Sequence, residues 1–212
     1  MKYDAIIFDF DGVLVESVDV KTQAFATLYL EYGPEVVKKV VDYHLQHGGI
    51  SRFTKFKYYQ EIVLGKKLKV GEEEQLGERF SQLVVEAIVN SPWVPGAGEF
   101  LKNYHKRIAL FVASGTPNEE LAEIIHRRNM EKYFISFHGT PAKKGEIIRA
   151  ILRKHFFEPN RVLMIGDALA DFEGAQIAKV DFLGRLTGDE NLFPRGTNLI
   201  QDLISLPNFL EV

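Results

Sequence analysis

The sequence predicts an α/β fold, with a doubly wound, Rossmann-like parallel-sheet core and an inserted α-helical subdomain. Short apolar runs rich in β-forming residues recur along the chain, and such runs are typical of buried parallel strands. Helical patterns lie between the later runs, and alternating strands and helices indicate a doubly wound sheet. One long segment after the first run breaks this alternation, because it has helical patterns and turn signals without a convincing buried strand.

The predicted strands follow from short apolar runs that are bounded by turn residues. In chain order they cover 5–10, 108–113, 135–138, 161–165 and, as a weaker signal, 181–186. Apolar residues recur at helical spacing after the second and third runs, which predicts helices over 117–128 and 144–155. This order of strands and helices is the basis of the predicted core.

The long helical segment is expected to form a cap that is inserted into the core. The cap covers 18–92, so the core is made of 1–17 and 93–212. A Pro/Gly-rich stretch over 91–98 indicates a linker that is followed by the start of a helix.

Composition excludes several classes of function. The chain has 212 residues with 46% hydrophobic content, a formal net charge of −3 and no cysteine. Disulfides, thiolate zinc sites and cysteine nucleophiles are therefore excluded, and a reducing, cytoplasmic location is expected. There is no basic surplus for nucleic acid and no apolar stretch of the roughly 20 residues that a membrane-spanning helix needs. We expect a monomer or a weak homodimer that binds a small molecule.

The stretch IIFDFDGVLVES places two carboxylates at the end of the first predicted strand. Residues two apart in an extended strand point the same way, so Asp9 and Asp11 begin near one another, and Gly12 lets the backbone turn away. The two carboxylates would repel unless a cation lay between them, and Mg²⁺ is a cation that takes such oxygen ligands. Ordinary turn chemistry is the alternative reading of Asp-x-Asp-Gly.

A second pair of carboxylates lies in VLMIGDALADFEGA, where another apolar run ends in Asp167 and Asp171 follows four residues later. With a helix that begins near Ala168, Asp171 lies in its first turn. Either aspartate alone is explained by helix capping. However, parallel strands place their ligands at their carboxyl ends, where Asp9, Asp11 and Asp167 would converge into a metal site.

Two further segments suit an anion. In FVASGTPNEE, Ser114, Gly115 and Thr116 are expected to open a helix, whose free N–H groups suit a phosphoryl oxygen, although a plain N-cap is the alternative. In HGTPAKKGEIIRAIL, Lys143 and Lys144 lie at a helix entrance, where a cation is misplaced unless it has an anionic partner. A solvated surface is the alternative for both lysines.

Taken together, DFDGVLVES, ASGT, the lysine at 144 and GDALAD resemble the motifs of the haloacid dehalogenase-like (HAD) hydrolase superfamily, in the same order and over residues 5 to 175. The helical insertion is similar to the subfamily I cap of phosphoglycolate phosphatases and β-phosphoglucomutases. The joint match is specific, whereas each motif alone is not.

The resemblance implies roles for the motif residues. Asp9 would attack phosphorus to form an aspartyl-phosphate, and Asp11 would be the general acid and base. Ser114, with Gly115 and Thr116, would hold the phosphoryl group, and Lys144 would neutralise its charge; the family spacing from Gly139 to Glu146 favours Lys144 over Lys143. The implied Mg²⁺ ligands are the Asp9 carboxylate, the Asp11 main-chain carbonyl and Asp167, with Asp171 in support. Glu16 departs from the family, which often has Asp there.

The cap is expected to select the substrate. GGISRFTKFKYY, residues 48 to 59, resembles the cap loop whose arginine faces the substrate in related enzymes. Arg52 is therefore the first candidate for substrate binding and Lys55 the second. His44 and His47 could share a helix face, but we interpret them as surface histidines because no third metal ligand is in view.

The expected function is a Mg²⁺-dependent phosphomonoesterase acting on a small phosphorylated metabolite through an aspartyl-phosphate. One alternative is a β-phosphoglucomutase-like mutase, which usually has a histidine near the position of Lys21. A phosphonate hydrolase would need a Schiff-base lysine such as Lys55 or Lys57, and a non-catalytic phosphate-binding protein is the fourth option. The physiological substrate, the pathway, the oligomeric state and the resting position of the cap stay open.

Overall fold

A computed structural model, which describes residues 2–188 and 191–211, contains a six-stranded parallel sheet in the order β3-β2-β1-β4-β5-β6. The strands are β1 (Ala5–Phe8), β2 (Ala109–Pro117), β3 (Ser136–Thr140), β4 (Val162–Gly166), β5 (Asp181–Arg185) and β6 (Asn198–Ile200). The central strand β1 pairs with β2 on one side and with β4 on the other. Strand order therefore reverses at β1, and a ligand crevice is expected at the carboxyl ends of these three strands.

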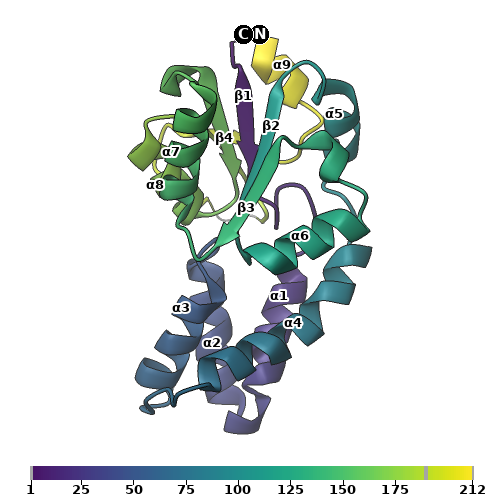
Figure 1. Ribbon diagram of the computed structural model, residues 1–212. Helices are drawn as coiled ribbons and strands as arrows, with labels where there is room; N and C mark the ends of the chain where they lie inside the picture. The colour runs from purple at the N-terminus through teal and green to yellow at the C-terminus, as the bar shows by residue number, and fades with distance from the viewer. Residues whose placement is uncertain (1, 189–190, 212) are drawn as a thin grey trace.

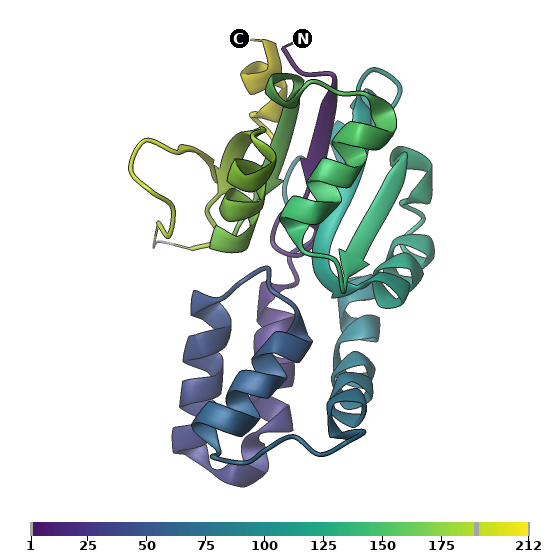
Figure 2. The same ribbon diagram turned by 60° about the vertical axis from the view of Figure 1, so that its left-hand side comes forward.

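Helices cover both faces of the sheet, because alternate residues of each strand point to opposite faces. Ile7 packs with α7 and α8, whereas Ile6 and Phe8 pack with α5, α6 and α9. These helices are α5 (Ala97–Tyr104), α6 (Asn118–Arg127), α7 (Lys144–His155), α8 (Leu169–Ala178) and α9 (Leu206–Glu211). Figures 1 and 2 show this layered core, with both chain ends at the edge opposite to the helical insertion.

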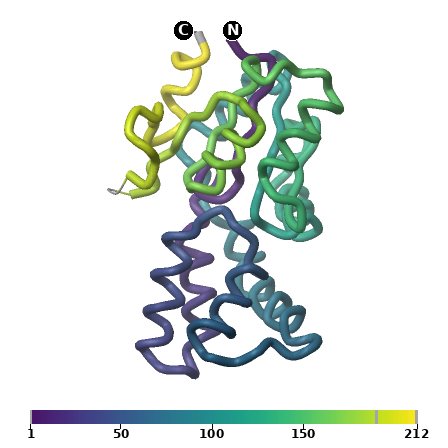
Figure 3. The backbone as a smooth tube through the Cα atoms, turned by 90° about the vertical axis from the view of Figure 1, so that its left-hand side faces the viewer, coloured from purple at the N-terminus to yellow at the C-terminus, as the bar shows by residue number. Residues whose placement is uncertain are grey.

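The remaining helices form a bundle beyond the carboxyl edge of the sheet (Figures 1 and 3). They are α1 (Val18–Leu28), α2 (Pro34–Gln46), α3 (Arg52–Tyr58) with a π-helical turn (Tyr59–Val63), and α4 (Glu72–Asn90). Phe25 lies at the centre, with its ring centroid 4.4 Å from that of Phe80 and 5.9 Å from that of Phe56. Buried aromatic side chains of this kind contribute much of the apolar area that stabilises a small bundle. Short 3₁₀ turns complete the described chain at Leu30–Tyr32, Glu131–Tyr133 and Pro159–Arg161.

Two neighbouring linkers join the bundle to the sheet. Val15 forms an antiparallel bridge with Trp93, and the Glu16 N–H donates to the carbonyl of Pro92 at 3.0 Å. An arginine holds each linker. Arg185 of β5 donates to the Gly12 carbonyl at 2.7 Å and to Glu16. Arg128 donates to three carbonyls at the C-terminal end of α4, those of Ile88, Val89 and Ser91. The bundle is thus attached to the sheet through backbone and guanidinium hydrogen bonds.

The predicted α/β fold is confirmed, and the five predicted strands match β1 to β5 within a few residues. The prediction missed β6, which has three residues at the sheet edge and an exposed face. It was also wrong that Ser114–Thr116 opens a helix. These residues continue β2, and α6 begins only at Asn118, after Pro117. The strand is longer than its apolar run because Pro117 still pairs with Thr140 beyond a register shift. In the described part of the chain, no helix is long and apolar enough to cross a membrane.

Candidate active site

The carboxyl ends of β1 and β4 bring three aspartates together. Asp9 follows β1 directly, Asp167 follows β4, and Asp171 lies in the first turn of α8. One carboxylate oxygen from each residue lies within 4.8 Å of the other two. We call Asp9, Asp167 and Asp171 the carboxylate cluster. Three carboxylates from two neighbouring strand ends form a donor set that suits a hard divalent cation.

Local backbone geometry fixes the cluster. The Asp171 carboxylate accepts a hydrogen bond of 3.1 Å from the Ala168 N–H, so it caps α8 while it faces the strand ends. Gly12 has a φ of +72°, and a Cβ at this position would lie 2.2 Å from Asp167 Oδ2. A glycine is therefore required where the chain leaves β1, both for its dihedral angle and for the close approach of Asp167.

The ammonium group of Lys144 lies beside the carboxylate cluster. Its Nζ donates to Asp9 Oδ2 at 2.7 Å and also contacts Asp171, and its side chain is 4% exposed. Lys144 is the first residue of α7, so the N-terminus of this helix lies next to the cluster. Lys143 is exposed and acts as the N-cap residue instead. The structure therefore places Lys144, and not Lys143, beside the carboxylates.

Burial disfavours the charged forms of the carboxylates in the cluster. Burial raises the pKa of Asp171 to about 7, and the neighbouring Asp9 charge adds to this effect. Burial, followed by the charge of Asp9, raises the pKa of Asp167 well above its ordinary value. Burial opposes the charge on Lys144, but Asp171 and Asp9 outweigh it and raise the pKa of this lysine. One lysine does not balance three carboxylates, so the residues fit an added divalent cation.

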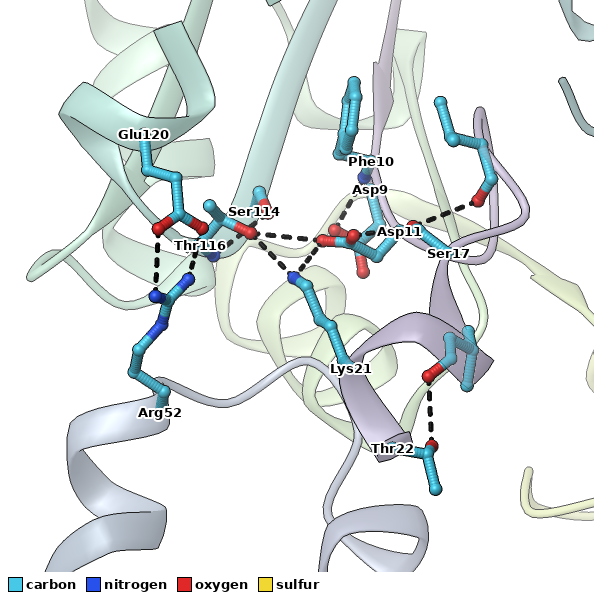
Figure 4. Close-up of polar contacts among 12 residues, drawn as sticks. Asp9, Phe10, Asp11, Ser17, Lys21, Thr22, Arg52, Ser114, Thr116 and Glu120 are labelled. Atoms are coloured by element: carbon cyan, nitrogen blue, oxygen red, sulfur yellow. Dashed lines mark hydrogen bonds and ion pairs between the residues drawn. The ribbon is translucent and has the colours of Figure 1, made fainter. Parts of the chain in front are cut away.

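Asp11 lies beside the cluster but has its own partners (Figure 4). Its carboxylate accepts hydrogen bonds from Ser17 Oγ at 2.7 Å, from Thr116 Oγ1 at 3.1 Å and from Lys21 Nζ. Burial alone would raise the pKa of Asp11, but Lys21, Ser17 and Thr116 together lower it. Asp9 and Asp11 are therefore held in different environments although they are two residues apart, and such a difference allows two carboxylates to have different roles.

The segment Ser114–Thr116 at the end of β2 lies where the core meets the helical bundle. Ser114 is buried, and its Oγ accepts the N–H of Thr116 at 3.1 Å. A Cβ on Gly115 would lie 2.6 Å from the carbonyl oxygen of Gly49, which belongs to the loop before α3. Gly115 thus permits the bundle to approach the end of β2.

A pocket of about 120 Å³ separates the carboxylate cluster from the bundle. Asp9, Asp11, Asp167 and Gly115 line it from the core. From the bundle it is lined by Val18, Lys21, Phe25, His44, Leu45, Gly48, Gly49, Ile50, Arg52, Lys55 and Phe80. We call Arg52 and Lys55, the two buried cations that α3 contributes to the pocket, the basic wall.

The two cations of the basic wall have different partners. Arg52 makes a bidentate ion pair with Glu120 of α6, in which Nη1 lies 2.9 Å from Oε2. Ser81 Oγ donates a hydrogen bond to the same carboxylate. Figure 4 shows that this pair joins α3 to the core helix. The Lys55 Nζ lies 2.8 Å from His44 Nδ1 instead.

Sequence reasoning did not find three of these polar residues, Lys21, His44 and Glu120, as parts of the site. His44 was interpreted as a surface histidine, which is wrong, because it is buried and lines the pocket. A period of 3.6 would have placed His44 on the same face as the buried Val40 of α2, which is a usable signal. No local pattern marks Glu120, because it lies 68 residues from Arg52 in the sequence.

Comparisons with known proteins agree with this geometry. The family model described as haloacid dehalogenase-like hydrolase matches residues 3–179. The phosphorylated carbohydrates phosphatase of Thermotoga maritima is 27% identical over 183 residues, which covers 84% of this chain and 82% of that protein.

Solved structures share the fold over nearly the whole chain. A predicted phosphoglycolate phosphatase from Haemophilus somnus superposes with a TM-score of 0.77 at 17% identity, covering 99% of each chain. A predicted phosphatase from Clostridium acetobutylicum gives 0.77 at 18% identity, again over 99% of each chain. At this identity the likeness shows the architecture alone.

Proposed function

The chain belongs to the haloacid dehalogenase-like hydrolase family, and on that premise we propose that it is a Mg²⁺-dependent phosphomonoesterase. Its substrate is a small phosphorylated metabolite, and the reaction proceeds through an aspartyl-phosphate on Asp9. The observation that carries the proposal is the separation of Asp9 and Asp11. Asp9 contacts Lys144 within the carboxylate cluster, whereas Asp11 is held by Ser17, Lys21 and Thr116.

The first step is attack of an Asp9 carboxylate oxygen on phosphorus. The bond from phosphorus to the ester oxygen breaks, its electron pair stays on that oxygen, and the oxygen takes a proton from the Asp11 carboxyl. Lys144, which already donates to Asp9, neutralises the charge of the attacking carboxylate and of the phosphoryl oxygens. Ser114, Gly115 and Thr116, at the end of β2, hold the phosphoryl group.

The second step restores the enzyme. A water molecule gives a proton to the Asp11 carboxylate and attacks phosphorus, and the bond between Asp9 and phosphorus breaks to release phosphate. The lowered pKa of Asp11 favours the base form that this step needs. In the first step Asp11 is the acid, so its carboxyl group must already carry a proton. Lower pH therefore favours departure of the leaving group.

The residues that would hold Mg²⁺ are Asp9 and Asp167, through their carboxylates, and Asp11 through its main-chain carbonyl, with Asp171 in support. The bound ion would supply charge neutralisation for the phosphoryl oxygens. The raised pKa values of Asp167 and Asp171 support this assignment, because burial, followed by repulsion from Asp9, disfavours their charged forms and a divalent cation would favour them.

We propose further that residues 18–92 act as a cap over a core of 1–17 and 93–212. The pocket is lined from both parts, and Gly115 allows the loop at Gly49 to lie against the end of β2. Closure of this kind keeps bulk water away from the reacting groups. The name of the Thermotoga relative supports a phosphorylated carbohydrate as substrate.

The proposal is tested by measuring phosphate release from sugar phosphates, phosphoglycolate, nucleotides and 4-nitrophenyl phosphate, with Mg²⁺ and with a chelator. Asp9→Asn is expected to lower kcat by at least about 10³-fold, because the amide is not a nucleophile. Asp4→Asn is the matched control, since Asp4 is exposed just before β1 and pairs with Arg161. Metal-independent turnover, or activity that survives in Asp9→Asn, would overturn the proposal. Conversion of a hexose 1-phosphate into its 6-phosphate would replace it with the mutase alternative.

A further inference from the structure

The basic wall contains one cation that is neutralised and one that is not. Arg52 and Lys55 lie three residues apart on α3 and are both buried, at 4% and 2% exposure. Glu120 neutralises Arg52 through a bidentate ion pair. Residues of the described chain offer Lys55 no carboxylate within ion-pair distance, and its hydrogen-bond acceptors are Nδ1 and the carbonyl oxygen of His44.

His44 adds a second unsatisfied group next to Lys55. A protonated lysine can only donate, so Nδ1 of His44 accepts, and the proton of the neutral ring is on Nε2. This Nε2 is buried and has no hydrogen-bond partner among the described residues. The ring stays neutral, because burial, followed by the charge of Lys55, lowers the pKa of His44 to about 2. A buried donor without an acceptor is costly, and in a ligand pocket it points to an absent ligand atom.

The ammonium group of Lys55 also lacks a counterion in the described part of the chain. Burial, followed by the charges of Lys21 and Lys144, lowers the pKa of Lys55 to about 7. An anion that entered the pocket beside Lys55 would raise this pKa again and hold the amine in its charged form. Lys55 and Asp9 line the same pocket, so the anion would belong to the part of the substrate that leaves after phosphoryl transfer.

The charge balance of the pocket limits what this anion can be. Lys21 is paired with Asp11, Arg52 with Glu120, and Lys144 with Asp9 and Asp171. One lysine charge therefore remains on the cap side, and it matches a monovalent carboxylate better than a second phosphate, which carries a charge near −2. Phe25 and Phe80 are among the apolar residues that line the same pocket from the bundle.

We propose that Lys55, assisted by His44, binds a carboxylate on the leaving group, so that the preferred substrates are phosphate esters of hydroxy acids, including sugar acids. The inference rests on the proposed phosphomonoesterase and names its substrate class. Arg52 is then a positioning residue that joins α3 to α6, because Glu120 already occupies its guanidinium group.

The test compares substrate pairs that differ only by a carboxylate in place of a hydroxymethyl group. These are 3-phosphoglycerate with glycerol 3-phosphate, and 6-phosphogluconate with sorbitol 6-phosphate. The wild-type enzyme is expected to prefer the acid of each pair by about 10-fold or more in kcat/KM, the range that a hydrogen bond to a charged group supplies. Lys55→Met is expected to remove this preference, mainly through KM.

Lys57→Met is the matched control, because Lys57 is exposed on the same helix and should keep the preference. Equal kcat/KM for both members of each pair, or a preference that survives in Lys55→Met, would overturn the inference. A preference for fructose 1,6-bisphosphate over fructose 6-phosphate would replace the carboxylate by a second phosphate. Trapping of a substrate on Lys55 by borohydride would make the lysine a nucleophile instead.

A binding measurement separates this inference from the proposed function. Calorimetric titration of 3-phosphoglycerate and glycerol 3-phosphate into the Asp9→Asn protein measures the preference without turnover. Absence of phosphatase activity on all esters, with the acid still bound at least tenfold more tightly, would refute the phosphomonoesterase and keep the carboxylate site. Phosphatase activity without any preference for the acid, in binding or in turnover, would keep the phosphomonoesterase and refute the carboxylate site.

Discussion

The carboxylate cluster and the basic wall face each other across one pocket, but the fold holds them in different ways. The cluster lies directly after two neighbouring strands and in the first turn of α8, and one carboxylate oxygen of each residue lies within 4.8 Å of the other two. The cations of the wall lie on α3 and depend on side-chain partners, which are Glu120 from the core for Arg52 and His44 from α2 for Lys55. In this protein the sheet positions the groups proposed for phosphoryl transfer, and the pairing of side chains determines which cations of the pocket are neutralised.

The largest expected effect comes from removing the positive charge of Lys144 beside the carboxylate cluster. Lys144→Met leaves Asp9 and Asp171 buried without their counter-charge, so kcat is expected to fall by about 10³-fold. Steady-state assays with 4-nitrophenyl phosphate measure the loss, and thermal unfolding shows whether the variant folds. Lys143→Met is the matched control, since Lys143 is exposed. Equal losses in both variants would mean that Lys144 has no special place beside the cluster.

The second-largest effect is expected when the ion pair between Arg52 and Glu120 is broken. Glu120→Gln removes the charge that neutralises buried Arg52, so the free energy of unfolding is expected to fall by about 3 kcal/mol. Urea denaturation measures this change. Glu119→Gln changes the exposed neighbour on α6 and should stay within about 0.5 kcal/mol of the wild type.

Glu120→Gln also sharpens the comparison between the two cations of the wall. With its partner gone, Arg52 becomes a second uncompensated cation in the pocket. Relative activity on fructose 1,6-bisphosphate over fructose 6-phosphate is therefore expected to rise in this variant. An unchanged ratio together with unchanged stability would show that the pair with Glu120 is not what separates Arg52 from Lys55.

The smallest effect is a gain in stability when the unpaired cation is removed. Lys55→Met is expected to raise the free energy of unfolding by about 2 kcal/mol at pH 6, because a buried ammonium without a counterion is replaced by an apolar side chain. The test is urea denaturation of both proteins without substrate. A variant less stable than the wild type would mean that Lys55 is well compensated in the free protein.

The same substitution has a pH dependence with a definite sign. The pKa of Lys55 is about 7 in the folded protein and 10.5 ordinarily, so between these values the unfolded chain binds the proton that the folded protein releases. Wild-type stability therefore rises with pH relative to Lys55→Met, and the advantage of the variant is largest below pH 7 and shrinks towards pH 10.5. Both proteins share the charged or titratable groups around this position, which are Asp11, Lys21, His44, Lys144 and Asp167. A difference that stays constant over this range would contradict the lowered pKa.

Local sequence was sufficient for the sheet and for most of the carboxylate cluster. Five strands, the helical insertion and the convergence of Asp9 and Asp167 follow from apolar runs that end in carboxylates, because parallel strands bring their carboxyl ends to one edge. The sixth strand was not predictable, since a strand of three residues, two of them exposed, is too short to show a periodicity. The end of β2 was misjudged because its last residues pair with β3 across a register shift that no local pattern shows.

The sequence by itself thus determined the fold class, the family resemblance and most of the residues that we propose for phosphoryl transfer. Only the tertiary structure decided which cations are neutralised. Arg52 and Lys55 look alike in sequence, as basic residues on one helix, and they differ because Glu120 arrives from a helix 68 residues away while His44 faces Lys55 from α2. Ion pairs form over a few ångströms, whatever the separation of their partners along the chain. The buried cation of α3 without a carboxylate partner among the described residues can therefore be identified only after the chain has folded.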